Sequence, residues 1–129
     1  MEHNLESLSL NIFSKKIGPE GARTLARNTS WQNLSKLHLE NNNIEPEGAL
    51  ALAQNISWTR LNCLNLASNN IDAEGAEALA KNTVWKNLES LDLKDDDNAP
   101  EVEAEIARIL AQNSIPLNKN LSDRIKIFW

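Results

Sequence analysis

The 129-residue chain contains little cysteine and no long apolar segment. Its single cysteine, Cys63, cannot form an internal disulfide, which fits a reducing compartment such as the cytoplasm. No apolar run approaches the ~20 residues that a membrane-spanning helix requires. The first residues carry neither a basic nor an apolar segment, so no secretory signal peptide is predicted. We therefore expect a cytoplasmic protein without a membrane partner.

A surplus of positive charge is also missing. Thirteen Lys and Arg residues stand against 18 Asp and Glu residues, which gives a net charge of −5 at pH 7. Without a basic surplus there is little counterion release from a phosphate backbone, so nucleic acid is not expected as a partner. The composition, with 41% hydrophobic and 24% charged residues, is that of a globular protein, and the length predicts a single domain over 1–129.

Residues that usually carry catalysis or bind metals are sparse and unsuitably spaced. The four glycines all lie near predicted helix starts, which leaves no phosphate-cradling loop. Two histidines and one cysteine give no metal-ligand spacing. A Ca²⁺ loop beginning at Asp95 would need glycine and glutamate where Pro100 and Ile106 stand. We therefore expect no metal, no cofactor and no enzymatic activity.

The dominant feature that is present is a repeat of 27 residues. Two unrelated residue types share this interval: Trp31, Trp58 and Trp85, and Gly21, Gly48 and Gly75. A period of about 20 to 50 residues is typical of a solenoid or a propeller, in which each unit buries its apolar face against its neighbours. The units are expected to begin near residues 4, 33, 60 and 87, and a capping tail is expected over 114–129.

Each unit divides into a short strand and a helix. The segment 37–39 alternates leucine, histidine and leucine, which is the period of a strand with one buried face. Ala49, Leu52 and Ala53 follow at helical spacing, and the same spacing recurs in the preceding and following units. Trp31 and its repeats are expected to line the edge of the core rather than to form an exposed ladder.

The pattern Leu34-x-x-Leu37-x-Leu39-x-x-Asn42-x-Ile44, which recurs from Leu61 to Ile71, resembles the leucine-rich repeats. The longer, ribonuclease-inhibitor-like class is the most similar. This resemblance implies an α/β fold, a right-handed β-α solenoid with a parallel concave sheet and convex helices. It also implies a non-catalytic module that binds a protein partner on the concave face.

The phrasing N-x-I-x-x-E-G-A is similar to short repeat proteins of intracellular bacteria and to Ran GTPase-activating proteins. The bacterial similarity implies an effector that reaches a host cell cytosol without a secretory signal peptide. The second similarity leaves GTPase activation open as an alternative. A further alternative is a fragment of a longer repeat array without an independent function.

The concave face is expected to carry the specificity. Its predicted columns are Ser7, Lys36, Cys63 and Ser90; Ser9, His38, Asn65 and Asp92; and Asn11, Glu40, Ala67 and Lys94. The column with serine, histidine and aspartate is not a triad, because strands ~4.8 Å apart place His38 about 10 Å from Asp92. None of the columns contains an aromatic anchor, so a weak binding face and a face without any binding role both remain open.

The end units depart from the pattern. Alignment of Leu8 with Leu37 predicts two extra residues in the first unit, and Asp96 stands where the fourth unit should have an asparagine. Since an ionised aspartate cannot donate a hydrogen bond, the predicted asparagine ladder should weaken there. The segment 124–129 alternates again and predicts a fifth, capping strand. We expect a monomer or a weak homodimer through a solenoid end.

Overall fold

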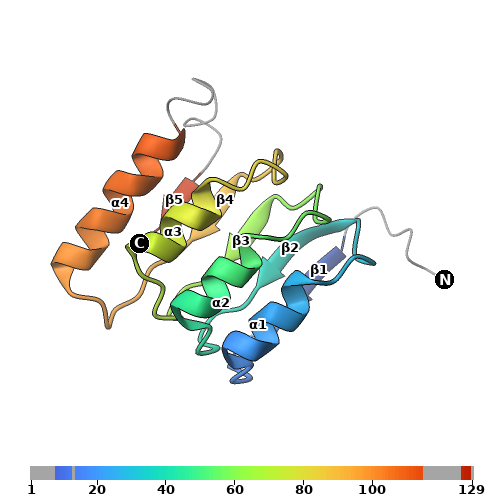
Figure 1. Cartoon of the computed structure of the whole chain (residues 1–129), viewed down its shortest axis with the longest axis horizontal. Helices are drawn as coiled ribbons and strands as arrows, with labels where there is room; N and C mark the ends of the chain where they lie inside the picture. The colour runs from blue at the N-terminus through green and yellow to red at the C-terminus, as the bar shows by residue number, and fades with distance from the viewer. Residues whose placement is uncertain (1–7, 13, 115–125, 129) are drawn as a thin grey trace.

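The computed structural model describes residues 8–12, 14–114 and 126–128. Its strands are β1 (Leu8–Asn11), β2 (Leu34–His38), β3 (Cys63–Asn65), β4 (Ser90–Asp92) and β5 (Lys126–Phe128). Its helices are α1 (Gly18–Ala26), α2 (Glu45–Leu52), α3 (Ala73–Ala80) and α4 (Pro100–Ser114). All five strands form one parallel sheet in the order β1-β2-β3-β4-β5 (Figure 1).

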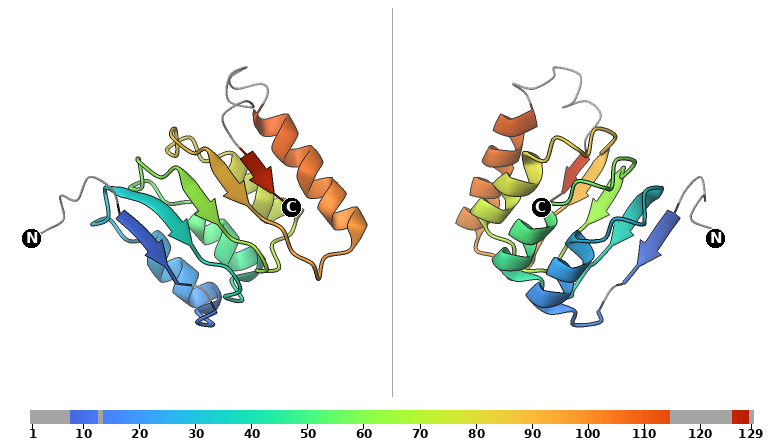
Figure 2. Two further views of the ribbon diagram at one scale, coloured as in Figure 1. Left: turned by 180° about the vertical axis from the view of Figure 1, so that it is seen from behind. Right: turned by 45° about the vertical axis from the view of Figure 1, so that its right-hand side comes forward.

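The four helices cover one face of this sheet and leave the other face open (Figure 2). Each helix packs against the helix of the next coil, from α1 to α4. Neighbouring strands lie ~4.8 Å apart, whereas packed helices need about 8–10 Å. Stacked coils of this kind therefore curve, with the sheet on the concave side and the helices on the convex side. The α/β solenoid with a parallel concave sheet and convex helices is confirmed.

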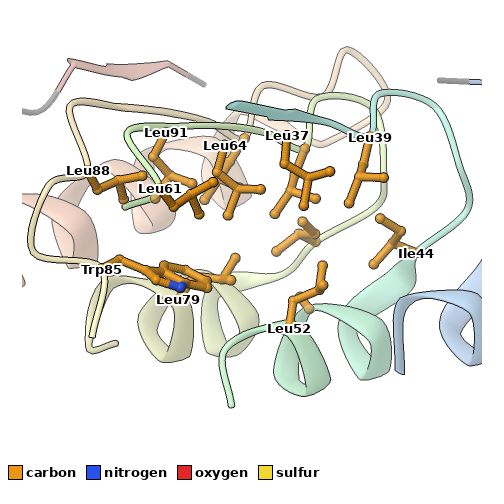
Figure 3. Close-up of a cluster of buried hydrophobic side chains, with 14 of the residues drawn as sticks. Leu37, Leu39, Ile44, Leu52, Leu61, Leu64, Leu79, Trp85, Leu88 and Leu91 are labelled. Carbon is orange, nitrogen blue, oxygen red and sulfur yellow. The ribbon is translucent and has the colours of Figure 1, made fainter. Parts of the chain in front are cut away.

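The space between the two layers is filled by the repeating leucines, isoleucines and tryptophans (Figure 3). In the second coil, Leu37 and Leu39 from the strand side meet Ile44 and Leu52 from the helix side, and all four are fully buried. Trp58 is fully buried, Trp85 is 4% exposed, and Trp31 packs half-buried against the same core. The tryptophans are therefore core residues, as predicted.

Glycine at position 48 allows consecutive coils to approach closely. A Cβ atom there would lie 2.5 Å from Ile44 Cγ2 and 3.0 Å from Ala22 Cβ in the preceding helix. Both distances are too short for carbon atoms, so a side chain at Gly48 would push α2 away from α1.

The front turn, between each strand and its helix, is held by the predicted asparagine ladder. Asn69 Oδ1 accepts from the backbone N–H groups of Asn42 and Ile44, at 2.8 and 3.1 Å, and its Nδ2 donates to the Leu39 carbonyl at 2.7 Å. Asn42 makes the same three kinds of bond to the first coil, with Lys15 N, Ile17 N and Ile12 O. Each amide thus joins its own coil to the one before.

The front turn also needs left-handed backbone at two positions in each of the first three coils. These positions are Ser14 and Lys16, Asn41 and Asn43, and Ser68 and Asn70, with φ between 55° and 60°. Asparagine tolerates this region better than most residues, which explains part of the asparagine content of the chain.

The first coil has the same length as the second and third coils, so the prediction of two extra residues was wrong. Leu10, not Leu8, lies opposite Leu37, and a bulge between Leu8 and Ser9 separates the two registers. Lys15 consequently stands where the second and third coils have Asn42 and Asn69, because its backbone N–H donates to Asn42 Oδ1 as that of Asn42 donates to Asn69 Oδ1. Strands have a side-chain period of two, so both alignments bury leucines and the sequence alone could not choose between them.

The fourth coil continues the ladder through Asp95 rather than the predicted Asp96. Asp95 is 6% exposed, and its Oδ2 accepts from the backbone N–H of Asn70 at 2.7 Å. Asp96 is exposed. Beyond α4 the predicted fifth strand is confirmed, since β5 pairs in parallel with β4 and places Ile127 opposite Leu91.

Candidate functional site

The open face of the sheet presents nine described residues in three rows, which we call the open-face residues. They are Lys36, Cys63 and Ser90; His38, Asn65 and Asp92; and Glu40, Ala67 and Lys94. Because side chains alternate along a strand, the leucines between them point into the core and these residues point away from it. The grouping of the nine agrees with the predicted columns.

The residues predicted from the first coil lie one row away from the rows to which the sequence assigned them. Ser9 lies opposite Lys36, not His38, and Asn11 lies opposite His38. The earlier column assignments of Ser9 and Asn11 were therefore wrong, for the same reason of register as Leu8. Ser7 lies outside the described residues.

The first row contains the single cysteine. Burial raises the pKa of the Cys63 thiol, while a hydrogen bond with Ser90 and the positive charge of Lys36 act in the opposite direction. Since burial is the largest of these effects, the thiol remains protonated at neutral pH. The surroundings of Cys63 therefore do not supply a thiolate nucleophile.

The second row keeps histidine and aspartate apart. Asn65 lies between His38 and Asp92 on the intervening strand, so the two side chains are separated by two strand spacings, about 10 Å. Asp92 Oδ1 accepts from the backbone N–H of Lys94 at 3.0 Å, and Asn65 Oδ1 accepts from that of Ala67 at 3.0 Å. This register keeps His38 and Asp92 on non-adjacent strands, and the side chains of Asn65 and Asp92 bond to the backbone just beyond the ends of their own strands.

The third row holds the most constrained charged group on the open face. Glu40 Oε2 accepts from Asn65 Nδ2 at 3.1 Å, and Glu40 Oε1 lies 3.8 Å from His38 Nδ1. Oε1 is buried, and no described residue forms a hydrogen bond with it. Sequence reasoning missed this group of three residues, because Glu40 and Asn65 belong to different columns and meet diagonally across adjacent strands.

The nine open-face residues together carry no net charge, in contrast to the chain. Lys36 and Lys94 balance Glu40 and Asp92, whereas the whole chain carries −5. The acidic surplus lies instead at the front turns and helix starts, for example at Glu45, Glu47, Asp72 and Glu74. The open face is therefore suited to a partner with charges of both signs.

The described ranges contain neither a metal-binding cluster nor a helix that could span a membrane. Within residues 8–12, 14–114 and 126–128, His, Cys, Asp and Glu side chains nowhere gather in threes or more to hold a metal ion. In the same part of the chain, none of the helices combines the length and the apolar character needed to cross a bilayer.

The two central coils match a known protein family. A family model described as Leucine Rich repeat matches residues 32–53 and 59–80. This chain is a leucine-rich repeat protein. No curated protein matches it.

The two matched repeats contain β2 with α2 and β3 with α3, so they also contain six of the nine open-face residues. Repeats of this family generally act as protein-interaction scaffolds. The face of this leucine-rich repeat protein that carries these residues is the one that the helices leave open.

Proposed function

We propose that this leucine-rich repeat protein is a non-catalytic module that binds a protein partner through the open face of its sheet. The observation that carries the proposal is the layer arrangement: four helices cover one face, and nine mostly polar residues project from the other. A row of side chains on a rigid parallel sheet is already positioned before binding, which lowers the entropic cost of association. The separation of His38 from Asp92 and the raised pKa of Cys63 support a role without catalysis.

The helices support assignment to the ribonuclease-inhibitor-like class. Each coil returns through an α-helix of eight or more residues rather than through a short turn. The packing of α1 through α4 into one continuous layer also supports a single domain over 1–129. The effector role, the location and the oligomeric state stay predictions of the resemblance and the sequence.

The experiment is a pull-down with the full chain, followed by affinity measurements on the partner that it identifies. We expect the triple variant Lys36→Ala, His38→Ala, Asp92→Ala to lose about tenfold or more in affinity, because each substitution removes a projecting group from the face. The matched control is Arg23→Ala, Gln54→Ala, Glu77→Ala on the helix layer, for which we expect less than about a twofold change. Equal or larger losses in the control would contradict the proposal.

A further inference from the structure

We propose that the end of the solenoid at the first coil is a second interaction surface, which binds an extended, acidic segment of another protein. This surface, the first-coil end, consists of four apolar residues of the first coil and the basic residues beside them. It is separate from the open face of the sheet, so the inference goes beyond the function proposed for that face. Four observations carry it: half-covered core positions, a free strand edge, a surplus of hydrogen-bond donors and positive charge.

The apolar residues of the first coil are less covered than their equivalents in the next coil. Four core positions of the first coil are only half-buried: Ile12, Ile17, Leu25 and Trp31. The equivalent residues one period later are all fully buried: Leu39, Ile44, Leu52 and Trp58. The first coil covers the second, whereas no described coil covers the first. A partner that packs on these side chains therefore gains the hydrophobic stabilisation that the later coils obtain within the chain.

Strand β1 leaves one of its edges free. It stands first in the sheet order and, within the described sheet, pairs on one side only, with β2 (Figure 1). An edge strand presents unpaired backbone N–H and C=O groups, to which an extended segment can add as a further strand. Since side chains alternate along a strand, every second residue of that segment points between the layers, towards Ile17 and Leu25. The partner segment is therefore extended, with apolar residues at alternate positions.

The first coil presents donors where the second coil uses donors and acceptors together. At the front turn Lys15 takes the ladder position, and its side chain, unlike that of Asn42, can donate but cannot accept. At the rear turn, Asn55 Nδ2 donates to a carbonyl of the preceding coil at 2.9 Å. Its equivalent, Asn28 Nδ2, donates among the described residues to Ser30 Oγ alone. A partner at this end therefore has to supply acceptors, which carboxylates and backbone carbonyls do.

The first coil is also the basic part of the chain. Residues 8–33 contain four basic residues and one acidic residue, whereas each of the three following coils, up to residue 114, contains more acidic than basic residues. The one acidic residue, Glu20, already pairs with Arg23 at 2.7 Å. The positive charge of the chain is thus concentrated in the same coil as the half-covered core positions.

Three basic residues of the first coil remain for a partner. Lys15, Lys16 and Arg27 are exposed and take no part in the ion pairs of the described chain. The two lysines belong to the front turn and Arg27 caps the end of α1, so they lie at opposite ends of the coil. Charge complementarity favours a segment with aspartate or glutamate on both sides of its apolar residues. Two copies of this chain would instead bring like charges together at this end.

The test is selection of random peptides displayed on phage against the full chain, followed by affinity measurements on synthetic copies of the enriched sequences. We expect these sequences to carry alternate apolar residues between aspartate or glutamate residues. The first-coil variant, Lys15→Glu, Lys16→Glu, Arg27→Glu, should weaken their binding by about tenfold or more. The matched control reverses one exposed basic residue in each other coil, Arg60→Glu, Lys81→Glu, Arg108→Glu, and should change the affinity by less than about twofold.

The results also separate this inference from the proposed function. Enriched peptides without carboxylates, no enriched peptide at all, or unchanged affinity for the first-coil variant would overturn the inference. Peptides weakened only by the Lys36, His38, Asp92 triple variant would bind the open face, which supports the proposed function and rules out the first-coil end. Thermal unfolding of the first-coil variant and its control checks that both fold as the parent does.

Two other occupants of the first-coil end are distinguished in the same set of measurements. A concentration-dependent dimer in sedimentation that the first-coil variant abolishes would overturn the inference in favour of a second copy of this chain. Peptide binding that strengthens by about tenfold in the variant Glu2→Gln, Glu6→Gln would overturn it in favour of the chain's own first residues. We expect a monomer in sedimentation and peptide affinities that this glutamine variant leaves unchanged.

Discussion

Each coil has a front turn, between strand and helix, and a rear turn, between helix and next strand. Both turns contain asparagine at the same 27-residue period, yet the two asparagines bond to different backbone groups. In the front turn, Asn69 directs both its Oδ1 and its Nδ2 to the preceding coil. In the rear turn, Asn55 Oδ1 accepts from Ser57 N and Trp58 N of its own coil, at 3.0 and 2.9 Å. Only its Nδ2 reaches back, to the Ala26 carbonyl at 2.9 Å.

The rear asparagines form a second ladder along the solenoid. Asn82 repeats the arrangement of Asn55, with Oδ1 accepting from Val84 N at 2.8 Å and Nδ2 donating to the Ala53 carbonyl at 2.9 Å. The comparison teaches that one residue type can either join neighbouring coils or shape a single turn, depending on which backbone groups the turn leaves unpaired. The front ladder joins coils, and the rear ladder mainly ends helices and positions the tryptophans.

The largest effect is expected at the centre of the front ladder. Asn69→Ala leaves Asn42 N, Ile44 N and Leu39 O without a partner in a buried turn, so we expect it to lower the free energy of unfolding by about 3 kcal/mol. Urea unfolding followed by circular dichroism measures this change. A loss below about 0.5 kcal/mol would show that the amide is not what joins these coils.

A smaller loss is expected in the rear ladder. Asn55→Ala also leaves three backbone groups unpaired, but two belong to its own turn, next to half-buried Ser57, where water can replace the amide. We expect about 2 kcal/mol, less than for Asn69→Ala. Hydrogen exchange sharpens the comparison, since Asn55→Ala should deprotect the Trp58 amide while leaving Asn42 N protected. Equal deprotection at both amides would contradict the separate roles.

The smallest effects are expected where the front ladder ends in the fourth coil. Asp95→Ala removes the acceptor of Asn70 N and should cost about 1 kcal/mol, because a single inter-coil bond is lost. Asp96→Ala is the matched control one residue away, and as an exposed residue it should change stability by less than about 0.5 kcal/mol. The urea midpoints of the two variants measure this difference. A larger midpoint shift for Asp96→Ala than for Asp95→Ala would show that Asp96 holds the ladder position, as the sequence predicted.

Much of the coil could be predicted because its information is local and repeated. The alternation at 37–39, the helical spacing of Ala49 and Leu52, and the ladder position of Asn42 recur at one period, and the structure confirms each of them. Repetition makes a weak local signal reliable, since every coil must satisfy the same backbone and bury the same layer.

The ends of the array could not be predicted in the same way. Leu8 and Leu10 are equally good partners for Leu37 as far as alternation is concerned, and hydrogen bonds to the second coil select Leu10. Asp95 and Asp96 are chemically identical, and only the path of the fourth turn decides which of them is buried. Where a pattern is not repeated, neighbouring coils supply the missing constraint.

By itself, the sequence determined the coil: its length, its strand and helix, its leucine and tryptophan core and its front asparagines. These follow from side-chain period, propensity and the need to bury apolar surface, all of which act within one or two repeats. The tertiary structure alone decided the register of the first strand, the rear ladder and the meeting of Glu40, Asn65 and His38 on the open face. Those features depend on which atoms of adjacent coils come within hydrogen-bond distance, and that is fixed only when the coils stack.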